Sequence, residues 1–291
     1  MNILDCVGKT PLLFLDRVSR LVGANIYAKL ENANPGHSAK DRAALAYLRG
    51  AMRRGELAPC GCVVEAASGN LGLALAQACL KLDLRLLLCL PESVGRARLS
   101  LLQAMGVHLF VTPAEDGIRG AMAKAAYHHD DTWGSFRPNP YSNPDGPDAY
   151  DEGLGAEIVL DAQSMGIKPD AFVCSIGSGA TFSGAGRRLR RVYPDIFLGA
   201  VISPACSVLE DSLPEEDSQK NPVSVFDRAL VSQQFSVDVA EAERAARKLL
   251  GMEGIVCGLS SGANLHAVLQ LAAQPEFRGK TIVMVVHDSG V

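Results

Sequence analysis

The sequence predicts an α/β protein built on a mostly parallel sheet with helices on both faces. Short runs of apolar and β-branched residues alternate along the chain with longer helical segments. Strands that are buried on both faces read as continuous apolar runs, and parallel strands need helical crossovers between them. With 291 residues, of which 48% are hydrophobic, the chain can bury a large core in one or two domains.

Six strands are predicted from runs that share this apolar, β-branched composition: 63–65, 85–90, 107–111, 171–176, 197–202 and 282–286. Helical segments such as 71–81 and 94–105 lie between them. Two stretches, 128–151 and 207–223, are rich in turn-forming or acidic residues and are predicted to be surface connections. The first is a candidate domain boundary.

Composition excludes several classes of function. A net charge of −4 argues against a surface that binds nucleic acid. The first residues, MNILDCVGKT, lack the basic segment and apolar core of a signal peptide, and no run approaches the ~18 apolar residues of a membrane span. We therefore expect a cytoplasmic protein with no membrane or nucleic-acid partner.

The eight cysteines show no pattern of metal binding. Most lie within apolar stretches, and they form no CxxC or Cys/His arrangement. Cys60 and Cys62 are close together but have no second pair. They are interpreted as small buried residues in a reducing compartment, with no metal site.

A short segment around one lysine predicts the start of a helix. Residues 34–42 read NPGHSAKDR, in which Pro35 and Gly36 interrupt the preceding structure and Ser38 is a good helix cap. The positive end of a helix favours the uncharged, nucleophilic form of a lysine amine. Such an amine forms a Schiff base with an aldehyde cofactor, so Lys40 is the candidate covalent anchor.

Two further segments each read as strand, loop and helix. In the first, 63–78, the loop is Ser68-Gly69-Asn70. In the second, 171–189, the loop 177–181 reads GSGAT. Glycine lets the backbone approach a ligand closely, and the first N–H groups of a helix bind anions. The second loop is therefore a candidate phosphate site, with hydroxyls from Ser178 and Thr181.

The order of these segments, followed by GLSSGA at 258–263, resembles the cysteine synthase and cystathionine β-synthase family of pyridoxal-phosphate enzymes. The resemblance runs over most of the chain. Further stretches that resemble the family are 7–12 (VGKTPL), 29–31 (KLE), 91–93 (PES), 112–113 (TP) and 117–121 (GIRGA).

The resemblance implies a cofactor and a role for each motif. Lys40 would form the internal aldimine with pyridoxal 5′-phosphate and act as general base, Asn70 would bond the 3′ oxygen, and Ser68 would orient the substrate. The cofactor phosphate would be held by Gly177, Ser178, Gly179, Ala180 and Thr181. Ser260 would meet the pyridine nitrogen, where a neutral hydroxyl suits β-elimination better than transamination.

The implied fold is fold type II, the tryptophan synthase β-like architecture, in which two domains each carry a mostly parallel twisted sheet. A small mobile domain would span 35–145, and a large cofactor-binding domain would combine 1–34 with 146–291. The part that closes over the substrate would be 95–120. The resemblance also implies a homodimer.

Some positions depart from the family pattern. The family's Thr-Ser-Gly-Asn-Thr loop, which helps to hold the substrate carboxylate, reads here with Ala67 and Leu71 in place of both threonines. A family glutamine aligns with Pro140. Each lost hydrogen bond to a charged group is worth roughly 1.5–3 kcal/mol. Either another cation compensates for the lost contacts, or the substrate differs. Candidates to bind a phosphate or a second carboxylate are four arginines: Arg96, Arg98, Arg119 and Arg137.

Three hypotheses follow. The first is β-replacement on an activated L-serine, O-acetylserine or O-phosphoserine, through an aminoacrylate. The second, suggested by Leu71, is condensation of phosphoserine with an amino acid, glutamate, in a synthesis of the diaminopropionate type. The third is a catalytically impaired paralogue with a binding role. It is motivated by the lost threonines and glutamine, by the absence of a Gly-Ile-Gly-x-Gly segment from 203–235, and by a tail that reads DSGV where the family continues with Arg-Tyr-Leu.

The residues at the expected site of the substrate carboxylate also affect which protein partners can bind. In the family, a serine acetyltransferase tail docks in this pocket. With Ala67, Leu71 and Pro140 in place of the polar residues, no such docking is expected. The expected partners are a small amino-acid substrate and a second copy of the chain.

Overall fold

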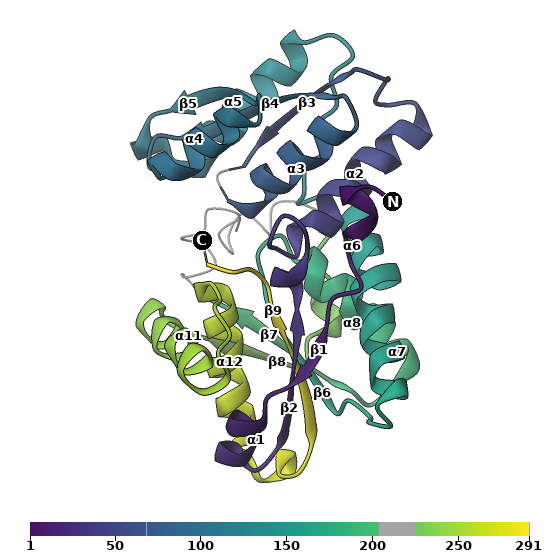
Figure 1. Ribbon diagram of the computed structural model, residues 1–291, viewed down its shortest axis with the longest axis vertical. Coiled ribbons are helices and arrows are strands. Elements are labelled where there is room, and N and C mark those ends of the chain that lie inside the picture. Colours follow the sequence, from purple (N-terminus) through teal and green to yellow (C-terminus); the bar gives the residue numbers. More distant parts are fainter. Residues whose placement is uncertain (68, 204–224, 291) are drawn as a thin grey trace.

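The computed structural model describes residues 1–67, 69–203 and 225–290 and contains two separate sheets (Figure 1). The six-stranded sheet has the order β1-β2-β9-β6-β7-β8. Its strands are β1 (Leu12–Phe14), β2 (Asn25–Leu30), β9 (Thr281–Val286), β6 (Ala171–Ser175), β7 (Phe197–Ile202) and β8 (Gln233–Ser236). Among the described strands of this sheet, β1 alone runs antiparallel to its neighbour.

The smaller sheet has three parallel strands in the order β3-β4-β5. They are β3 (Cys62–Ala66), β4 (Arg85–Pro91) and β5 (His108–Thr112). In the larger sheet, β2 pairs with β9 from Asn25 opposite Thr281 to Leu30 opposite Val286. Strands from near the two ends of the chain are thus neighbours in one sheet, while the smaller sheet comes from the middle of the chain.

Helices cover both sheets. They are α1 (Asp16–Val22), α2 (Lys40–Arg54), α3 (Asn70–Lys81), α4 (Arg96–Ala104), α5 (Gly117–Asp131), α6 (Asp145–Ala149), the π-helix η4 (Tyr150–Gly155), α7 (Ala156–Ser164), α8 (Ala180–Val192), α11 (Val239–Glu253) and α12 (Leu259–Ala272). Figure 1 shows α1, α11 and α12 on one side of the larger sheet and α7 and α8 on the other. None of the helices that the structure describes has the length and apolar character needed to cross a membrane.

Strand β9 shows why the larger sheet is buried on both faces. Val283 and Val285 belong to the hydrophobic cluster on the α2 and α8 side. Ile282, Met284 and Val286 belong to the cluster on the α12 side. Successive side chains of a strand point to opposite faces, so a strand covered by helices on both sides is apolar throughout.

The α/β fold with mostly parallel, helix-covered sheets is confirmed, and all six predicted strands are present. Strands β1, β2 and β8 were not predicted. The surface connection expected at 128–151 is wrong in part, because it contains the end of α5, all of α6 and the start of the π-helix, with Tyr150 1% exposed. That segment is helical because it packs on α8, where a Cβ at Gly184 would lie 2.1 Å from the Pro147 carbonyl oxygen.

The second predicted connection, 207–223, lies outside the described residues. The division into domains at 35 and 145 stays a prediction. One hydrophobic cluster runs through both sheets, joining Val63 and Leu88 of the smaller sheet with Phe172 and Val283 of the larger one.

Candidate active site

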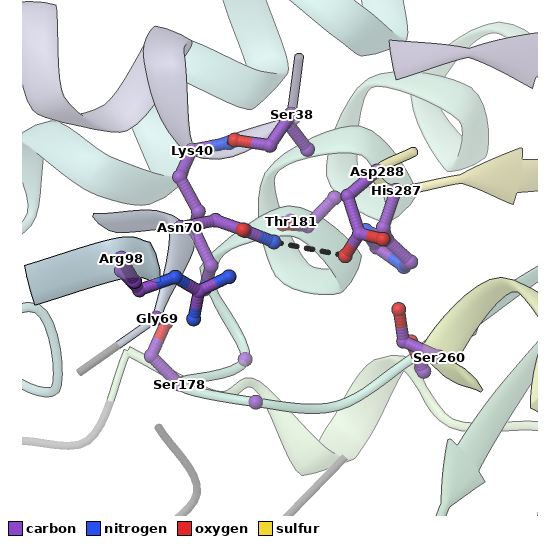
Figure 2. Close-up of a pocket in the computed structure, with 14 residues that line it drawn as sticks. Ser38, Lys40, Gly69, Asn70, Arg98, Ser178, Thr181, Ser260, His287 and Asp288 are labelled. Atoms are coloured by element: carbon purple, nitrogen blue, oxygen red, sulfur yellow. Dashed lines mark hydrogen bonds between the residues drawn. The ribbon is translucent and has the colours of Figure 1, made fainter. Parts of the chain in front are cut away.

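A pocket lies where the first residues of α2, α3, α8 and α12 meet the segment that follows β9 (Figure 2). Its lining consists of Ser38, Ala39, Lys40, Gly69, Asn70, Arg98, Ser175, Gly177, Ser178, Gly179, Thr181, Ser260, His287 and Asp288. Parallel strands place their carboxyl ends at one edge of a sheet, and ligand sites of α/β proteins lie beyond that edge. The pocket follows this rule, since β3, β6 and β9 each lead into it.

The structure brings most of the predicted site residues together. Lys40, Asn70, Gly177, Ser178, Gly179, Thr181 and Ser260 all line the pocket. Ala180 does not line it but is the first residue of α8, directly after the glycine loop. Ser68 lies outside the described residues.

Lys40 is the first residue of α2, and the residues before it are held from several directions. The Ser38 hydroxyl accepts a hydrogen bond from the Lys40 backbone N–H at 3.2 Å, but the N-cap residue of α2 is Ala39, so the prediction of Ser38 as the cap is wrong by one position. The Ala39 N–H donates to the His287 carbonyl at 2.8 Å, and the Tyr150 hydroxyl donates to the Ala39 carbonyl at 2.9 Å. These hydrogen bonds hold the backbone at the start of α2, and the Lys40 side chain projects from it into the pocket (Figure 2).

The loop after β3 presents Asn70 as the first residue of α3. Its side-chain N–H donates to an oxygen of Asp288 at 2.8 Å. The two departures in this loop, Ala67 and Leu71, are both buried in the hydrophobic cluster beneath it. They supply no polar group to the pocket, and Pro140 is not among its lining residues.

The loop after β6 forms a cradle at the start of α8. Gly179 has φ +91°, a conformation that glycine adopts without strain. A Cβ at Gly179 would also lie 2.4 Å from the Phe226 Cβ, so only glycine fits. The Ala180 N–H points back to the Ser178 hydroxyl at 3.4 Å. The backbone N–H groups at this helix start can hold a dianionic phosphate.

Ser260 is the second residue of α12 and lies 7% exposed. Its hydroxyl is buried and makes no hydrogen bond to any residue that the structure describes. A buried hydroxyl without a partner costs about 1–3 kcal/mol. A ligand atom that bonds this hydroxyl would remove that cost, and the ring nitrogen of pyridoxal phosphate is such an atom.

Sequence reasoning missed His287 and Asp288. Burial and the nearby Lys40 charge lower the pKa of His287 to about 3, so its ring is neutral at physiological pH. Its Nε2 lies 3.7 Å from the Cys174 sulfur. Burial raises the pKa of Asp288 despite hydrogen bonds from Gly290 and Asn70. The sequence feature that could have identified His287 and Asp288 is their position directly after a buried parallel strand, where ligand sites of α/β proteins lie.

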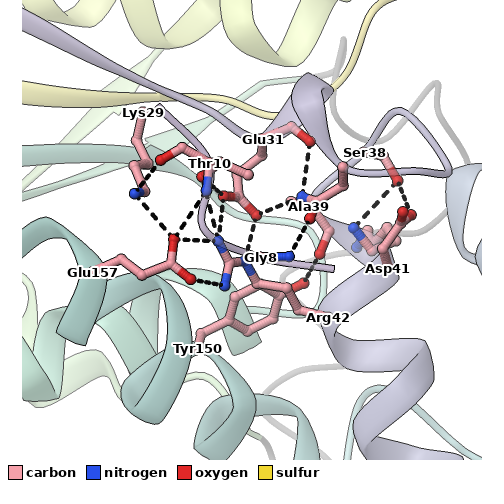
Figure 3. A network of polar contacts seen from close by, with 12 residues as sticks. Gly8, Thr10, Lys29, Glu31, Ser38, Ala39, Asp41, Arg42, Tyr150 and Glu157 are labelled. Atoms are coloured by element: carbon pink, nitrogen blue, oxygen red, sulfur yellow. Dashed lines mark hydrogen bonds and ion pairs between the residues drawn. The ribbon is translucent and has the colours of Figure 1, made fainter. Parts of the chain in front are cut away.

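A buried polar network holds α2 in place (Figure 3). Arg42 donates to Glu31 at 2.7 and 2.8 Å and to Glu157 at 2.7 and 2.8 Å. Lys29, 1% exposed at its side chain, lies 3.0 Å from Glu157 and 2.8 Å from Asp161. Burial raises the pKa of Glu157, but the Arg42 hydrogen bonds and charge outweigh it and lower that pKa to about 2.

This network gives a structural role to two motifs that carried the family resemblance. Lys29 and Glu31 come from the KLE motif, and the VGKTPL motif supplies Thr10, whose hydroxyl donates to Glu31 at 2.7 Å. Gly8 of the same motif donates its N–H to Asn34 at 2.8 Å. Both motifs therefore fix the helix that begins with Lys40.

The pocket fits pyridoxal phosphate on three counts. Lys40 can bond an aldehyde, and the start of α8 can hold a phosphate. The buried Ser260 hydroxyl has no partner in the described part of the chain, and a pyridine ring would supply one. No group of three or more metal-ligating side chains that could hold a metal ion occurs in the described part of the chain. Fold and pocket together define a fold type II pyridoxal-phosphate enzyme.

Comparison with known proteins supports the assignment to the pyridoxal-phosphate enzymes. A family model described as pyridoxal-phosphate dependent enzyme matches residues 3–288, and the chain belongs to this family. A cysteine synthase from Staphylococcus aureus (strain Mu50) is 33% identical over 99% of this chain and 94% of its own length. The crystal structure of a hydrogen sulfide-producing enzyme from Fusobacterium nucleatum has a TM-score of 0.88 at 29% identity, with 99% and 98% of the two chains covered.

An O-acetylserine dependent cystathionine beta-synthase from Helicobacter pylori has a TM-score of 0.86 at 30% identity, covering 100% of this chain and 95% of its own. The chain is thus a divergent member of the cysteine synthase type, and its cofactor is pyridoxal 5′-phosphate.

Proposed function

We propose that this protein catalyses β-replacement on an activated L-serine, O-acetylserine or O-phosphoserine, as cysteine synthases do. The observation that carries the proposal is that Lys40, Asn70, the glycine loop before α8 and the buried Ser260 hydroxyl, which has no partner among the described residues, all meet at one pocket. The similarity to enzymes whose names refer to cysteine, hydrogen sulfide and O-acetylserine supports it.

When bound, pyridoxal phosphate supplies an aldehyde that bonds amines and a ring that stabilises negative charge at the substrate's α-carbon. Lys40 is the proposed anchor, and its amine, once released, removes the α-proton and later returns it. The N–H groups at the start of α8 hold the phosphate. Ser260 meets the ring nitrogen with a neutral group. Asn70 and Ser68 orient ring and substrate.

A second candidate function is condensation of an activated serine with an amino-acid nucleophile, and one observation favours it. A neighbouring cavity shares Asn70, Arg98 and Asp288 with the candidate active site and is also lined by Arg247 and Leu250. A cavity with an arginine beside the reaction site has room and charge for a nucleophile larger than sulfide.

Attachment of the cofactor is tested first. The protein is loaded with pyridoxal phosphate, reduced with borohydride and digested, and the modified peptide is identified by mass spectrometry. We expect the added mass on Lys40, and none after Lys40→Ala. Modification at another lysine would overturn the proposed anchor.

The reaction is tested with O-acetylserine and O-phosphoserine, each combined with sulfide or with L-glutamate, and products are identified by mass spectrometry. Cysteine from the sulfide reactions supports β-replacement of the cysteine synthase type. A condensed amino acid from the glutamate reactions supports the second candidate. If Lys40 carries the cofactor and no combination gives a product, both functions are wrong.

We further propose a cytoplasmic homodimer in which a small domain of 35–145 moves against the rest, with Ser68 contacting the substrate. No docking of a serine acetyltransferase tail is expected. Light scattering after gel filtration measures the oligomer, and a monomer would contradict the first part. Tight, carboxylate-dependent capture of that tail peptide would contradict the last part.

A further inference from the structure

We propose that Tyr150 is a positioning residue, which couples the binding of phosphate at the start of α8 to the bond that Lys40 forms with an aldehyde. Tyr150 acts through two residues that line the pocket, Ala39 and Thr181. This inference rests on the proposed function, because it takes Lys40 as the anchor. It deepens that function by assigning a residue that aligns the anchor.

The buried Tyr150 side chain lies between the start of α2 and helix α8. It belongs to the first residue of the π-helix η4, and a Cβ at Gly184 of α8 would lie 2.8 Å from the Tyr150 Cβ. Burial raises the pKa of Tyr150, so its hydroxyl keeps its proton. A buried hydroxyl needs hydrogen-bond partners for its proton and for its oxygen.

The Tyr150 proton bonds the backbone beside the anchor. The hydroxyl donates to the Ala39 carbonyl at 2.9 Å (Figure 3). That carbonyl and the Lys40 N–H belong to one planar peptide group, so a bond to the carbonyl fixes the plane from which Lys40 extends. The N–H of the same group donates to the Ser38 hydroxyl at 3.2 Å. The peptide group before Lys40 is therefore held on both sides.

The Tyr150 oxygen bonds the phosphate side of the pocket. Thr181 is the second residue of α8, and its side chain forms a hydrogen bond with the Tyr150 hydroxyl that opposes the rise of the Tyr150 pKa. The Tyr150 hydroxyl has one proton, which the Ala39 carbonyl accepts, so Thr181 is the donor of this bond. Thr181 also supplies one of the first N–H groups of α8, which favour anions.

One hydroxyl thus joins the two places that hold a cofactor. A phosphate on the N–H groups of α8 fixes Thr181, Thr181 bonds Tyr150, and Tyr150 holds the peptide group from which Lys40 extends. Coupling between two binding events is reciprocal, so it can be measured as the change that phosphate causes in the affinity for an aldehyde. The π-helix agrees with such a role, since π-helical turns are rare and occur frequently at functional sites.

Inorganic phosphate and pyridoxal, which carries the aldehyde without the phosphate, serve as separate probes for the two places. The full chain is freed of cofactor, and the dissociation constant of pyridoxal is measured by absorbance without and with saturating phosphate. The Lys40 amine and the aldehyde form a C=N bond and release water. Borohydride trapping and mass spectrometry check that pyridoxal is attached at Lys40. The constant without phosphate, divided by the constant with phosphate, is the coupling factor.

We expect Tyr150→Phe, which removes only the hydroxyl, to lower the coupling factor about 3- to 10-fold, as the loss of one buried hydrogen bond would. The matched control is Tyr47→Phe, because Tyr47 is also a buried tyrosine, lies on α2 itself and has its hydroxyl beside Gly146. Its coupling factor should equal that of wild type. The phosphate charge acts on Lys40 in every variant, so the difference between variants isolates the Tyr150 link.

Thr181→Val removes the same link from the other end and replaces the first variant if Tyr150→Phe does not fold. It should lower the coupling factor to a similar value, and the double variant should lower it no further. Weaker binding of both ligands with an unchanged coupling factor would overturn the inference, because Tyr150 would then only support the fold. An equal fall in Tyr47→Phe would also overturn it.

Failure of the proposed function gives a different result. Wild-type protein that attaches no pyridoxal at Lys40 would overturn the proposed anchor together with this inference. An unchanged coupling factor in Tyr150→Phe, with pyridoxal on Lys40, would overturn this inference alone. Both probes bind without an amino-acid substrate, so a failure of β-replacement would leave the measured coupling valid.

Discussion

The side chain of Asn70 donates a hydrogen bond to Asp288 across 2.8 Å, and this bond joins the two sheets at the candidate active site (Figure 2). Asn70 begins the helix that follows β3 of the smaller sheet, whereas Asp288 follows β9 of the larger one. Asp288 is tightly enclosed, because a Cβ at Gly258 would lie 2.1 Å from its Oδ1. The position of Asn70 is therefore set by the segment after β9.

We predict that Asp288→Ala and Asn70→Ala are energetically coupled. Each variant removes one side of a partly buried bond, and a hydrogen bond to a charged group is worth about 1.5–3 kcal/mol. The double variant should therefore lose less stability than the sum of the single variants, by about 1 kcal/mol or more. Urea unfolding of the cofactor-free proteins measures this coupling, and strictly additive losses would contradict it.

Two adjacent serines of α12 should behave in opposite ways. The Ser260 hydroxyl has no hydrogen-bond partner among the described residues, whereas the Ser261 hydroxyl accepts the His287 backbone N–H at 2.9 Å. Ser260→Ala should leave the stability of the cofactor-free protein unchanged or slightly raised and should weaken cofactor binding. Ser261→Ala should lower that stability by about 1–3 kcal/mol, because it leaves a buried N–H unpaired.

These effects are measured by thermal unfolding of the cofactor-free variants and by fluorescence titration with pyridoxal phosphate. Equal loss of stability in both variants would contradict the prediction, because it would show that the Ser260 hydroxyl stabilises the cofactor-free protein.

The sequence predicted the parts of the site that local patterns determine. Lys40, the Asn70 loop and the glycine loop each combine a strand or turn signal with a helix start, within about ten residues. Asp288 carries no such signal. Its hydrogen-bond partner in the pocket is Asn70, which lies 218 positions away in the chain.

The strands and the helical segment that were not predicted also lack a local sequence signal. Strand β1 has three residues and β8 has four, too short for a periodic pattern, and two of the three side chains of β1 are exposed. Tyr150 was placed in a predicted surface connection because its neighbours are polar. Tertiary packing overrides that composition, since its hydroxyl bonds the Ala39 carbonyl beside Lys40.

Replacement of Gly179 by alanine should abolish cofactor binding. Its positive φ costs a non-glycine residue about 1–2 kcal/mol, and the added Cβ would also collide with Phe226. The matched control is Gly106→Ala, which has φ +76° but open space around the added atom. The control should show only the backbone cost. Fluorescence titration with pyridoxal phosphate checks this, and normal cofactor affinity in Gly179→Ala would contradict it.

Arg42→Ala should be strongly destabilising. Its removal leaves Glu31, which is 0% exposed, as a buried charge without its cationic partner. Breaking a buried ion pair costs about 3–5 kcal/mol. The control on the same helix is Arg54→Ala, whose side chain is 42% exposed and pairs with Glu56 and Asp145. Surface pairs contribute about 0–1 kcal/mol, so equal losses of unfolding free energy in urea would refute the prediction.

Asp41, next to Lys40, should make stability depend on pH. Burial raises its pKa from 3.8 to about 6, although hydrogen bonds from Gly36 and Ser38 oppose the change. Between these pH values the folded state binds more protons than the unfolded state. This group's contribution to stability is therefore fully present below pH 4 and is lost as the pH rises through 6, with a total of about 3 kcal/mol.

Asp41→Asn removes the titration while keeping an oxygen that accepts the Gly36 N–H. We expect the variant to match wild type near pH 4 and to gain in relative stability up to about pH 7, where the difference levels off. The exposed residue Asp16 provides the control Asp16→Asn. Unfolding free energies from urea titrations between pH 4 and 8 test this, and parallel curves for Asp41→Asn and wild type would mean that Asp41 is not protonated in that range.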